Sequence, residues 1–367
     1  MFNKLIILRN LWKTMGYSFV FKLVCLSVPK IFFRSKLRNN FKTIVFLMPS
    51  KGIGDGIIFT GLLKAMNNAG YEIYVLSRKD VAFFYEKISF IHGVIKYDLA
   101  NGISKKEILK QVGIHKFDIL IEMYGDTAPI AHRVNSMFAL KAKHKIGING
   151  DGILRSCMDY SIEYQELDKH LSNRGNYMLN YLGINTGLPG YQIDLSGKDL
   201  SKAQDFLSNI SGKFIVAFNP FASNERRSLS IVQVNSIIQM LLNYEDICVI
   251  VIGEKHKLAT LNINESKRLI INKLESFHEA CAVLKLCDFV VTSETSFVHV
   301  SNAFAKEMVC IYGSENMEEF DNNINFGPNY PGATQIIHPQ KRSVPEIDVK
   351  VINDTIKSRI ECCMGLK

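Results

Sequence analysis

The chain reads FVVTSETSFVH from residue 289 to residue 299, where an apolar strand gives way at once to a helix. A second such junction, PSKGIGD at residues 49 to 55, follows the apolar stretch 44 to 48. An open parallel sheet places its ligand-binding groups where strands end and helices begin. Because the two junctions lie far apart in the chain, we expect two similar sheet domains and an enzyme that brings two substrates together.

Short apolar runs alternate with amphipathic stretches around both junctions, which is typical of βαβ units and a parallel sheet. In the first half we expect strands at 44–48, 72–76, 94–97, 118–122 and 145–148, and helices at 55–68, 81–88, 104–112 and 129–140. In the second half we expect strands at 214–219, 247–252, 269–271, 289–291 and 308–312, and helices at 199–209, 231–242, 277–286 and 296–305. A bridge at 150–198 contains a helix at 170–182, and a last helix runs from Pro345 to about Cys362.

The length of 367 residues exceeds what one core usually fills, so two domains are the default. The pattern predicts an α/β protein with an N-terminal segment 1–42, a parallel-sheet domain 43–185, a second parallel-sheet domain 186–345 and a final helix 346–367.

The net charge of +9 is an N-terminal property. Residues 1 to 54 hold ten Lys or Arg and no acid, while the rest of the chain holds 34 basic and 35 acidic residues. The basic residues of 1–42 alternate with Leu, Ile, Phe and Trp12, which indicates a membrane surface rather than nucleic acid. Its apolar runs are shorter than the about 20 residues that a spanning helix needs, and no small-residue cleavage site follows them. The alternative is a first helix packed on the domain with its basic residues in water.

The eight cysteines include no Cys-x-x-Cys pair and no His partner at zinc spacing, so they predict free thiols in a reducing cytoplasm.

The glycine-rich loop Lys51-Gly52-Ile53-Gly54-Asp55 opens the first helix. Its glycines let the backbone approach a ligand closely and expose amides at a helix N-terminus. It matches neither Gly-x-Gly-x-x-Gly nor a Walker loop, so it does not imply a nucleotide. Asp55 is either the N-cap of the helix or a general base that takes a proton from an attacking hydroxyl.

The loop after residues 214–219 ends in Arg226 and Arg227. Guanidinium groups suit a diphosphate and can stabilise charge on a leaving group, although a solvated loop end is the common fate of surface arginine. Glu254, in the turn after residues 247–252, is either a ribose acceptor or a solvated turn residue.

Residues 293–299, called the box below, combine a carboxylate, hydroxyl groups and the amides of a helix start. Thr295 and Ser296 would present hydroxyls and amides to a phosphate, Glu294 could accept sugar hydroxyls, and His299 would lie one turn into the helix. The alternative is a plain capping sequence with a buried histidine.

In this order, the Gly-x-Gly-Asp loop, Asn219-Pro220 with a basic residue after it, the Gly253 turn and the Glu294-Thr295-(x)3-His299 box resemble glycosyltransferase family 9, the bacterial lipopolysaccharide heptosyltransferases, over roughly 43 to 315. The resemblance implies the GT-B fold, two facing Rossmann-like domains with parallel sheets. It implies a lipid-linked saccharide acceptor on the N-terminal domain and a nucleotide-sugar donor, ADP-heptose among the candidates, on the C-terminal one.

The resemblance also implies roles for single residues. Asp55 matches the catalytic base, with Lys51, Gly52 and Gly54 forming the loop on the acceptor side. Arg227, or Arg226 in its place, would contact the donor diphosphate where the family usually has Lys, and Glu254 would join the donor site. The box departs from the family's Asp-Thr-Gly-Pro-x-His, since Glu294, Ser296 and Phe297 replace Asp, Gly and Pro. These changes reshape the donor pocket.

These parts predict a single inverting displacement in the cytoplasm, at the inner face of the bacterial membrane. The chain contains no Asp-x-Asp, so a metal or other cofactor is not called for. The rivals are a nucleotide-sugar epimerase of the same plan, a catalytically silent homologue that binds donor or membrane, and a dinucleotide-dependent dehydrogenase. Absence of Gly-x-Gly-x-x-Gly counts against the dehydrogenase.

Overall fold

The computed structural model describes residues 41–48, 52–98, 103–123, 136–137, 139–149, 155, 157–208, 210–314, 316–317, 320–340 and 342–366. The predicted membrane segment 1–42 lies almost entirely outside this description, as do Lys51 and most of the helix predicted at 129–140. The described chain forms two compact units. Unit 1 holds 63–165 and 174–187 with the chain up to residue 51, and unit 2 holds 52–62, 166–173 and 188–367.

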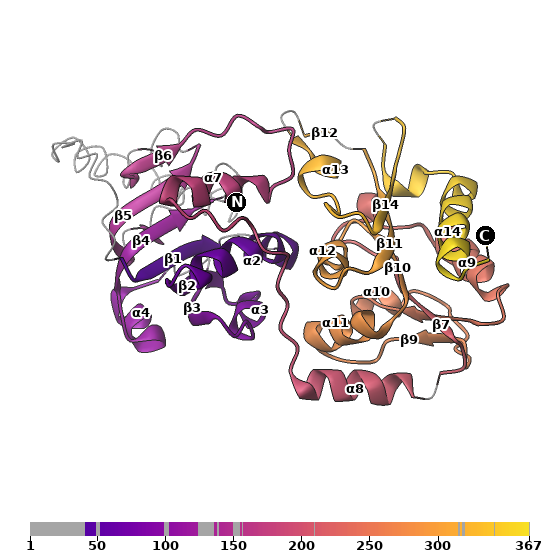
Figure 1. Ribbon diagram of the computed structural model, residues 1–367. Coiled ribbons are helices and arrows are strands. Elements are labelled where there is room, and N and C mark those ends of the chain that lie inside the picture. Colours follow the sequence, from indigo (N-terminus) through magenta and orange to yellow (C-terminus); the bar gives the residue numbers. More distant parts are fainter. Residues whose placement is uncertain are drawn as a thin grey trace, which may run out of the picture. The chain divides into compact units, whose positions relative to one another are not determined.

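Unit 1 is built on a six-stranded, wholly parallel sheet in the order β3-β2-β1-β4-β5-β6 (Figure 1). The strands are β1 (Thr43–Met48), β2 (Glu72–Arg78), β3 (Ile91–Tyr97), β4 (Lys116–Glu122), β5 (Lys141–Ile148) and β6 (Tyr160–Ile162). The helices are α3 (Ala82–Glu86), α4 (Lys105–Val112), α7 (Asn173–Leu182) and the last turns of α2 (Ile53–Asn68), whose residues up to Leu62 belong to unit 2. Ile108 of α4 joins Val45, Leu47 and Leu120 in the core of this unit.

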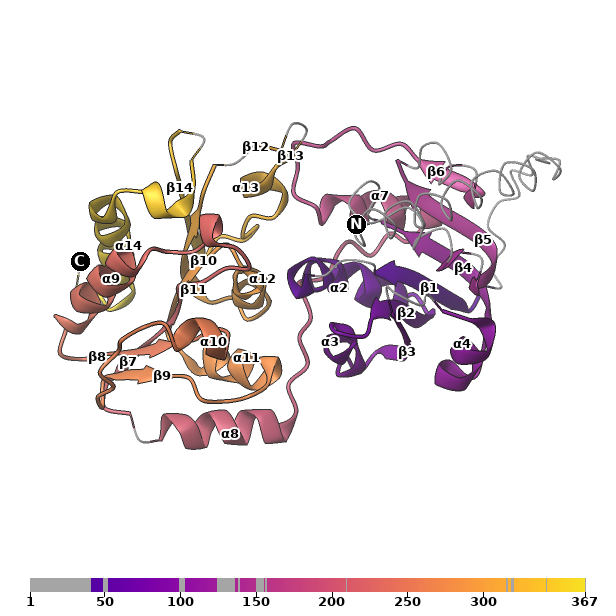
Figure 2. The same cartoon turned by 180° about the vertical axis from the view of Figure 1, so that it is seen from behind.

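Unit 2 repeats the plan with the sheet order β14-β11-β10-β7-β8-β9, also parallel throughout (Figure 2). The strands are β7 (Phe214–Asn219), β8 (Ile247–Val251), β9 (Leu269–Ile271), β10 (Phe289–Ser293), β11 (Glu307–Tyr312) and β14 (Ala333–Ile337). The longer helices are α8 (Gly197–Leu207), α9 (Ile231–Leu242), α11 (Phe277–Leu286), α12 (Ser296–Ala303) and α14 (Val349–Cys363). The shorter elements are η1 (Glu225–Arg227), α10 (Lys255–Leu258), β12 (Asn316–Met317), β13 (Phe320–Asp321), α13 (Asn322–Asn325) and η2 (Val344–Glu346).

The two sheets have the same connectivity. In each, the first strand lies beside the fourth, so the strand order reverses between β1 and β4 in unit 1 and between β7 and β10 in unit 2. This is the doubly wound order, and ligands of such sheets bind beyond the carboxyl ends of the strands at the reversal. The predicted α/β class, with two Rossmann-like parallel sheets, is confirmed.

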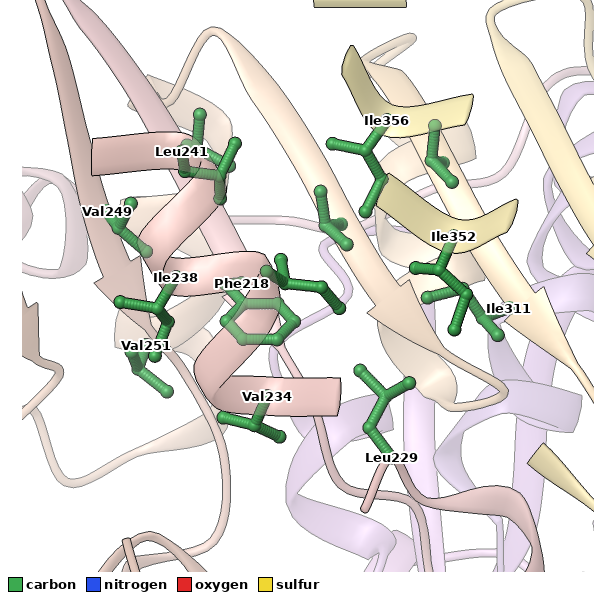
Figure 3. Packing of buried hydrophobic residues seen from close by; sticks show 14 of the residues in the cluster. Phe218, Leu229, Val234, Ile238, Leu241, Val249, Val251, Ile311, Ile352 and Ile356 are labelled. Carbon is green, nitrogen blue, oxygen red and sulfur yellow. The ribbon is translucent and has the colours of Figure 1, made fainter. Parts of the chain in front are cut away.

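The core of unit 2 shows why its strands are continuous apolar runs. β8 is buried along its whole length, because helices cover both faces of a parallel sheet. α9 and α14 pack against each other on one face, and Val234 and Ile238 of α9 belong to the same apolar cluster as Ile352 and Ile356 of α14 (Figure 3). α8 packs against α11.

Several helix starts follow from local sequence alone. Ser104, Ser196, Ser230 and Ser276 each accept a hydrogen bond from the backbone three residues later, and the side chain of that third residue returns one. Such capping boxes satisfy amide groups that an open helix end would leave without partners. These four starts agree with the predicted helices to within two residues.

Three further helices begin two or more residues from the expected start. The last helix, predicted from Pro345, begins at Val349 as α14, because Val344–Glu346 form the separate 3-10 turn η2. α2 begins at Ile53, so Asp55 occupies the third helical position and not the N-cap. A carboxylate in the first turn still interacts favourably with the helix dipole. α7 begins at Asn173, which leaves His170 in the irregular segment 166–173 that belongs to unit 2.

Candidate functional site

Three loops meet at the carboxyl ends of the central strands of unit 2. They follow β10, β7 and β8, which are neighbours in the sheet, and they carry Glu294, the 219–227 loop and Glu254 respectively. Thr292 of β10 is in register with Asn219 of β7, so the first two loops leave the sheet side by side. The structure therefore brings together three of the sequence-predicted donor segments.

The 219–227 loop is held in one shape by its own polar groups. The Ser228 hydroxyl accepts a hydrogen bond from the Ala222 amide at 2.9 Å and donates to the Asn224 carbonyl at 2.8 Å. The Asn224 side chain caps η1 by accepting from the Arg227 amide at 3.0 Å. Lys257 donates to the Ala222 carbonyl at 2.6 Å. This bracing fixes where Arg227 leaves the backbone.

Arg227 and Glu294 form an ion pair between two of these loops. Arg227 Nη1 lies 3.0 Å from Glu294 Oε1, and its Nη2 donates to the Ser223 hydroxyl at 2.8 Å. The exposed fractions of the two side chains are 32 % and 10 %. Arg226 is exposed. The sequence did not decide which of the two arginines would lie in the donor site. In the structure it is Arg227 that contacts Glu294.

Glu254 lies at the third loop and is 60 % exposed. Its carboxylate lies 3.1 Å from Lys257 Nζ, the same group that holds the Ala222 carbonyl, and 3.4 Å from His256 Nε2. Lys257 thus links the Glu254 turn to the Arg227 loop. Sequence analysis did not single out Lys257, because only the fold places it against Ala222.

The start of α12 is capped by Thr295. Its hydroxyl accepts a hydrogen bond from the Phe297 amide at 3.1 Å and lies 3.2 Å from the Thr292 hydroxyl. Ser296 is the first residue of the helix, so its amide is among those that an α-helix leaves without a partner within the helix.

His299 lies one turn into α12 and is 4 % exposed. Its ring centroid lies 6.1 Å from that of Tyr191 and 6.4 Å from that of His170, and the Tyr191 and His170 rings stack at 6.5 Å. Burial, with a smaller effect of His170, lowers the pKa of His299 to about 3. Burial lowers the pKa of His170 to about 4, although its Nε2 lies 3.2 Å from the Gly327 carbonyl. Both rings are therefore neutral at pH 7.

The first turn of α2 packs on this ring. A Cβ at Gly54 would lie 3.1 Å from His299 Cδ2 and 3.5 Å from Ser296 Cα, and these residues all belong to unit 2. Asp55 follows Gly54 in the same turn, whereas Gly52 precedes the helix and is exposed. Nothing in the spacing of the sequence predicted that His170, Tyr191 and Gly54 would surround His299.

Several buried polar atoms at this place have no hydrogen-bond partner among the described residues. They are Asn219 Oδ1, Arg227 Nε, Ser293 Oγ and His299 Nδ1. Buried polar groups are nearly always hydrogen-bonded, and an orphaned one costs about 1–3 kcal/mol. A polar ligand bound beyond these strand ends would have donors and acceptors there to pair with.

Metal-ligating residues do not gather in the described part of the chain. No group of three or more His, Cys, Asp or Glu side chains there is arranged to hold a metal ion.

Comparison with known proteins shows which family the chain belongs to. The model of glycosyltransferase family 9 (heptosyltransferase) matches residues 106–348. The chain belongs to that family. A curated relative, "Putative lipopolysaccharide heptosyltransferase 4" of Escherichia coli K12, is 23 % identical over 339 residues, which cover 90 % of this chain and 92 % of the relative.

Solved structures resemble this family 9 glycosyltransferase throughout its fold. A family 9 glycosyl transferase of Veillonella parvula superposes with a TM-score of 0.72 at 17 % identity, covering 89 % of this chain and 98 % of the other. E. coli ADP-heptose LPS heptosyltransferase II gives 0.65 at 15 % identity, with 87 % and 98 % covered. E. coli heptosyltransferase WaaC with ADP gives 0.63 at 16 % identity, with 86 % and 99 % covered. The predicted resemblance, the GT-B type of fold and the enzyme class are confirmed.

Proposed function

We propose that this glycosyltransferase moves a sugar, heptose first among the candidates, from a nucleoside diphosphate sugar to a lipid-linked saccharide with inversion at the anomeric carbon. The observation that carries the proposal is the Arg227–Glu294 pair among orphaned polar atoms at the strand-order reversal of unit 2. A guanidinium group suits a diphosphate, and a carboxylate suits sugar hydroxyls.

The roles follow from the chemistry of each group. Asp55 would take the proton of the acceptor hydroxyl as it attacks the anomeric carbon. Arg227, with Arg226 nearby in sequence, and the amides at Thr295 and Ser296 would stabilise the departing diphosphate. Glu294 and Glu254 would accept hydroxyls of the donor. The neutral ring of His299 could donate or accept a hydrogen bond without adding charge beside the phosphates.

The proposed reaction requires no metal, because guanidinium groups and helix-start amides supply the compensating positive charge. Transfer should therefore continue in the presence of EDTA, and loss of transfer with recovery on adding Mg²⁺ would contradict this part of the proposal.

ADP-heptose is the first donor to test. Two solved WaaC structures of the same fold hold ADP and ADP-2-deoxy-2-fluoro heptose, respectively. In this chain Glu294, Ser296 and Phe297 occupy the box where the family has Asp, Gly and Pro. Glu294 has a longer side chain than Asp and is paired with Arg227, so its carboxylate would lie at a different distance from a bound sugar. The sugar specificity therefore needs a test of its own, apart from the nucleotide specificity.

The acceptor is proposed to be a lipopolysaccharide-type or other lipid-linked saccharide at the inner face of the cytoplasmic membrane. The acid-free, apolar sequence of residues 1–42 supports this placement. Among the described residues, no helix is both long and apolar enough to cross a bilayer. Vesicle binding by the whole chain should exceed that of a chain starting at Asn40, and equal binding would refute the role of the segment.

A thermal-shift screen with ADP, UDP, GDP and CMP tests the donor site directly. A nucleotide present at 100 times its dissociation constant stabilises the native state by about 2.7 kcal/mol. We expect ADP to raise the melting temperature most, and no shift with any of the four would refute the site.

Asp55→Asn tests the reaction. The variant should keep the nucleotide shift and lose nearly all sugar transfer. Turnover of the nucleotide sugar by the wild type without acceptor would favour an epimerase, and nucleotide binding without transfer to any acceptor would favour a silent homologue.

A further inference from the structure

Unit 1 carries exposed positive charge where its strands begin. Lys116 and Lys141, the first residues of β4 and β5, are paired in register on neighbouring strands, and both are exposed. The loop before β4 adds His115, whose carbonyl accepts a hydrogen bond from the Lys141 amide at 3.2 Å. Burial, and then the positive charges of Lys105, Lys116 and Lys141, lower the pKa of His115.

The cluster differs from the lysines beside it. Lys143 lies 2.7 Å from Asp118, and Lys42 lies 2.6 Å from Glu72. Lys105, Lys116 and Lys141 form no ion pair with any residue that the structure describes. Like charges placed side by side on neighbouring strands repel each other, and an anionic partner would relieve that repulsion.

The same edge of the sheet receives the N-terminal segment. The Thr43 amide and hydroxyl and the Lys42 amide donate to the Asp118 carboxylate, which also accepts from Lys143. Burial opposes ionisation, but these hydrogen bonds lower the pKa of Asp118 to about 2, so the junction persists at neutral pH. The basic, acid-free sequence of residues 1–40 thus joins the fold where β1, β4 and β5 begin.

An apolar side chain accompanies the charge. Leu109 of α4 is 37 % exposed and stands one turn after Lys105, with exposed Lys106 and Lys110 on the same helix. Exposed lysines around an apolar side chain suit the headgroup region of a bilayer, where the apolar group enters and the charges meet phosphate. This combination, continuous in sequence with an apolar N-terminal segment, favours lipid over nucleic acid.

We infer that Lys105, Lys116 and Lys141, with Leu109 beside Lys105 on α4, form a second membrane-docking surface on the folded unit 1, and that its partner is a bilayer of anionic phospholipid. Its two strand residues, Lys116 and Lys141, lie at the end of the sheet where the strands begin, opposite the end that carries ligand loops in such folds. It does not depend on the identity of the donor sugar.

Vesicle co-sedimentation of the full chain with Lys116→Gln/Lys141→Gln tests this surface. On vesicles of phosphatidylcholine with phosphatidylglycerol, binding should fall about fivefold for each lysine, and so about 30-fold for the pair. The loss should shrink at high salt, because ions screen exposed charges. Lys116→Arg/Lys141→Arg, which keeps both charges, should bind like the wild type.

The matched control is Lys198→Gln/Lys350→Gln, which removes two exposed lysines of unit 2. An equal loss in both double variants would show a net-charge effect and overturn the proposal. Unchanged vesicle binding with weakened binding to a DNA duplex would also overturn it, by assigning the surface to nucleic acid. The nucleotide-induced thermal shift should be the same in every variant. Its presence or absence in the wild type tests the proposed donor site separately.

Discussion

Gly54→Ala tests whether the helix that carries Asp55 packs against the His299 ring. The added Cβ would lie 3.1 Å from His299 Cδ2 and 3.7 Å from Nε2, whereas unstrained carbon contacts lie at about 3.5–4.0 Å. The ring is 4 % exposed, and Tyr191 and His170 lie beside it, so it has little room to retreat. Overpacking of this kind usually costs about 1–3 kcal/mol.

The matched control is Gly197→Ala. Gly197 opens α8, as Gly54 lies in the first turn of α2, and a Cβ at Gly197 meets nothing within 4 Å. Neither glycine has a positive φ, so in both variants alanine reduces the entropy of the unfolded chain and stabilises by about 0.4–1 kcal/mol. The two variants therefore differ in the contact with His299.

We expect Gly197→Ala to be slightly more stable than the wild type and Gly54→Ala to be less stable than Gly197→Ala by about 1–3 kcal/mol. Urea denaturation measures this difference, and the nucleotide-induced thermal shift should be weakened only in Gly54→Ala. Equal stability of the two alanine variants would refute the packing of α2 on His299, and with it the nearness of Asp55 to the donor box.

Three further expectations use the same kind of comparison. Arg227→Gln should cost about 1–3 kcal/mol of stability, because it removes an ion-pair partner of the mostly buried Glu294 carboxylate, and it should also weaken nucleotide binding. Arg226→Gln should do neither to a similar degree in urea denaturation and thermal shift. Since the pKa of His170 is about 4 in the fold and near 6.5 unfolded, its neutral form stabilises the fold fully above pH 6.5, and this contribution is lost as the pH falls towards 4. In urea denaturation, His170 should contribute on the order of 2 kcal/mol to the stability lost at pH 5 relative to pH 7.5, and His299, with its pKa of about 3, should add to that loss. His170→Gln should therefore reduce the loss by about 2 kcal/mol, and an unchanged pH dependence would contradict the burial of this ring. Gln233→Leu should destabilise by about 2–3 kcal/mol, because its amide donates to the Val344 and Ile347 carbonyls from the middle of the core, and exposed Gln239→Leu on the same helix should be nearly silent in urea denaturation.

The elements that sequence located best are those whose signals are local. β8 is a run of apolar residues that only a strand covered on both faces can bury, and α9 opens with a serine and a glutamine at capping-box spacing. Sequence missed β6 and β14. β14 contains Thr334 and Gln335 and is only half buried, so it forms a strand because β11 offers it a partner and not because of its own composition.

The order of motifs along the chain was enough to indicate the family and the edge of the sheet where ligands bind, because strand ends and helix starts depend on residues that are neighbours in the sequence. The order of motifs could not predict that Arg227 and not Arg226 contacts Glu294. That contact depends on the η1 turn, which Asn224 caps, and on the distance from β7 to Glu294 after the neighbouring strand. The residues around His299 could not be predicted either. Gly54, His170 and Tyr191 come from distant segments of the chain, and no sequence periodicity indicates that these segments pack together. Sequence determined which residues could do the chemistry, and packing of distant segments decided which of them meet.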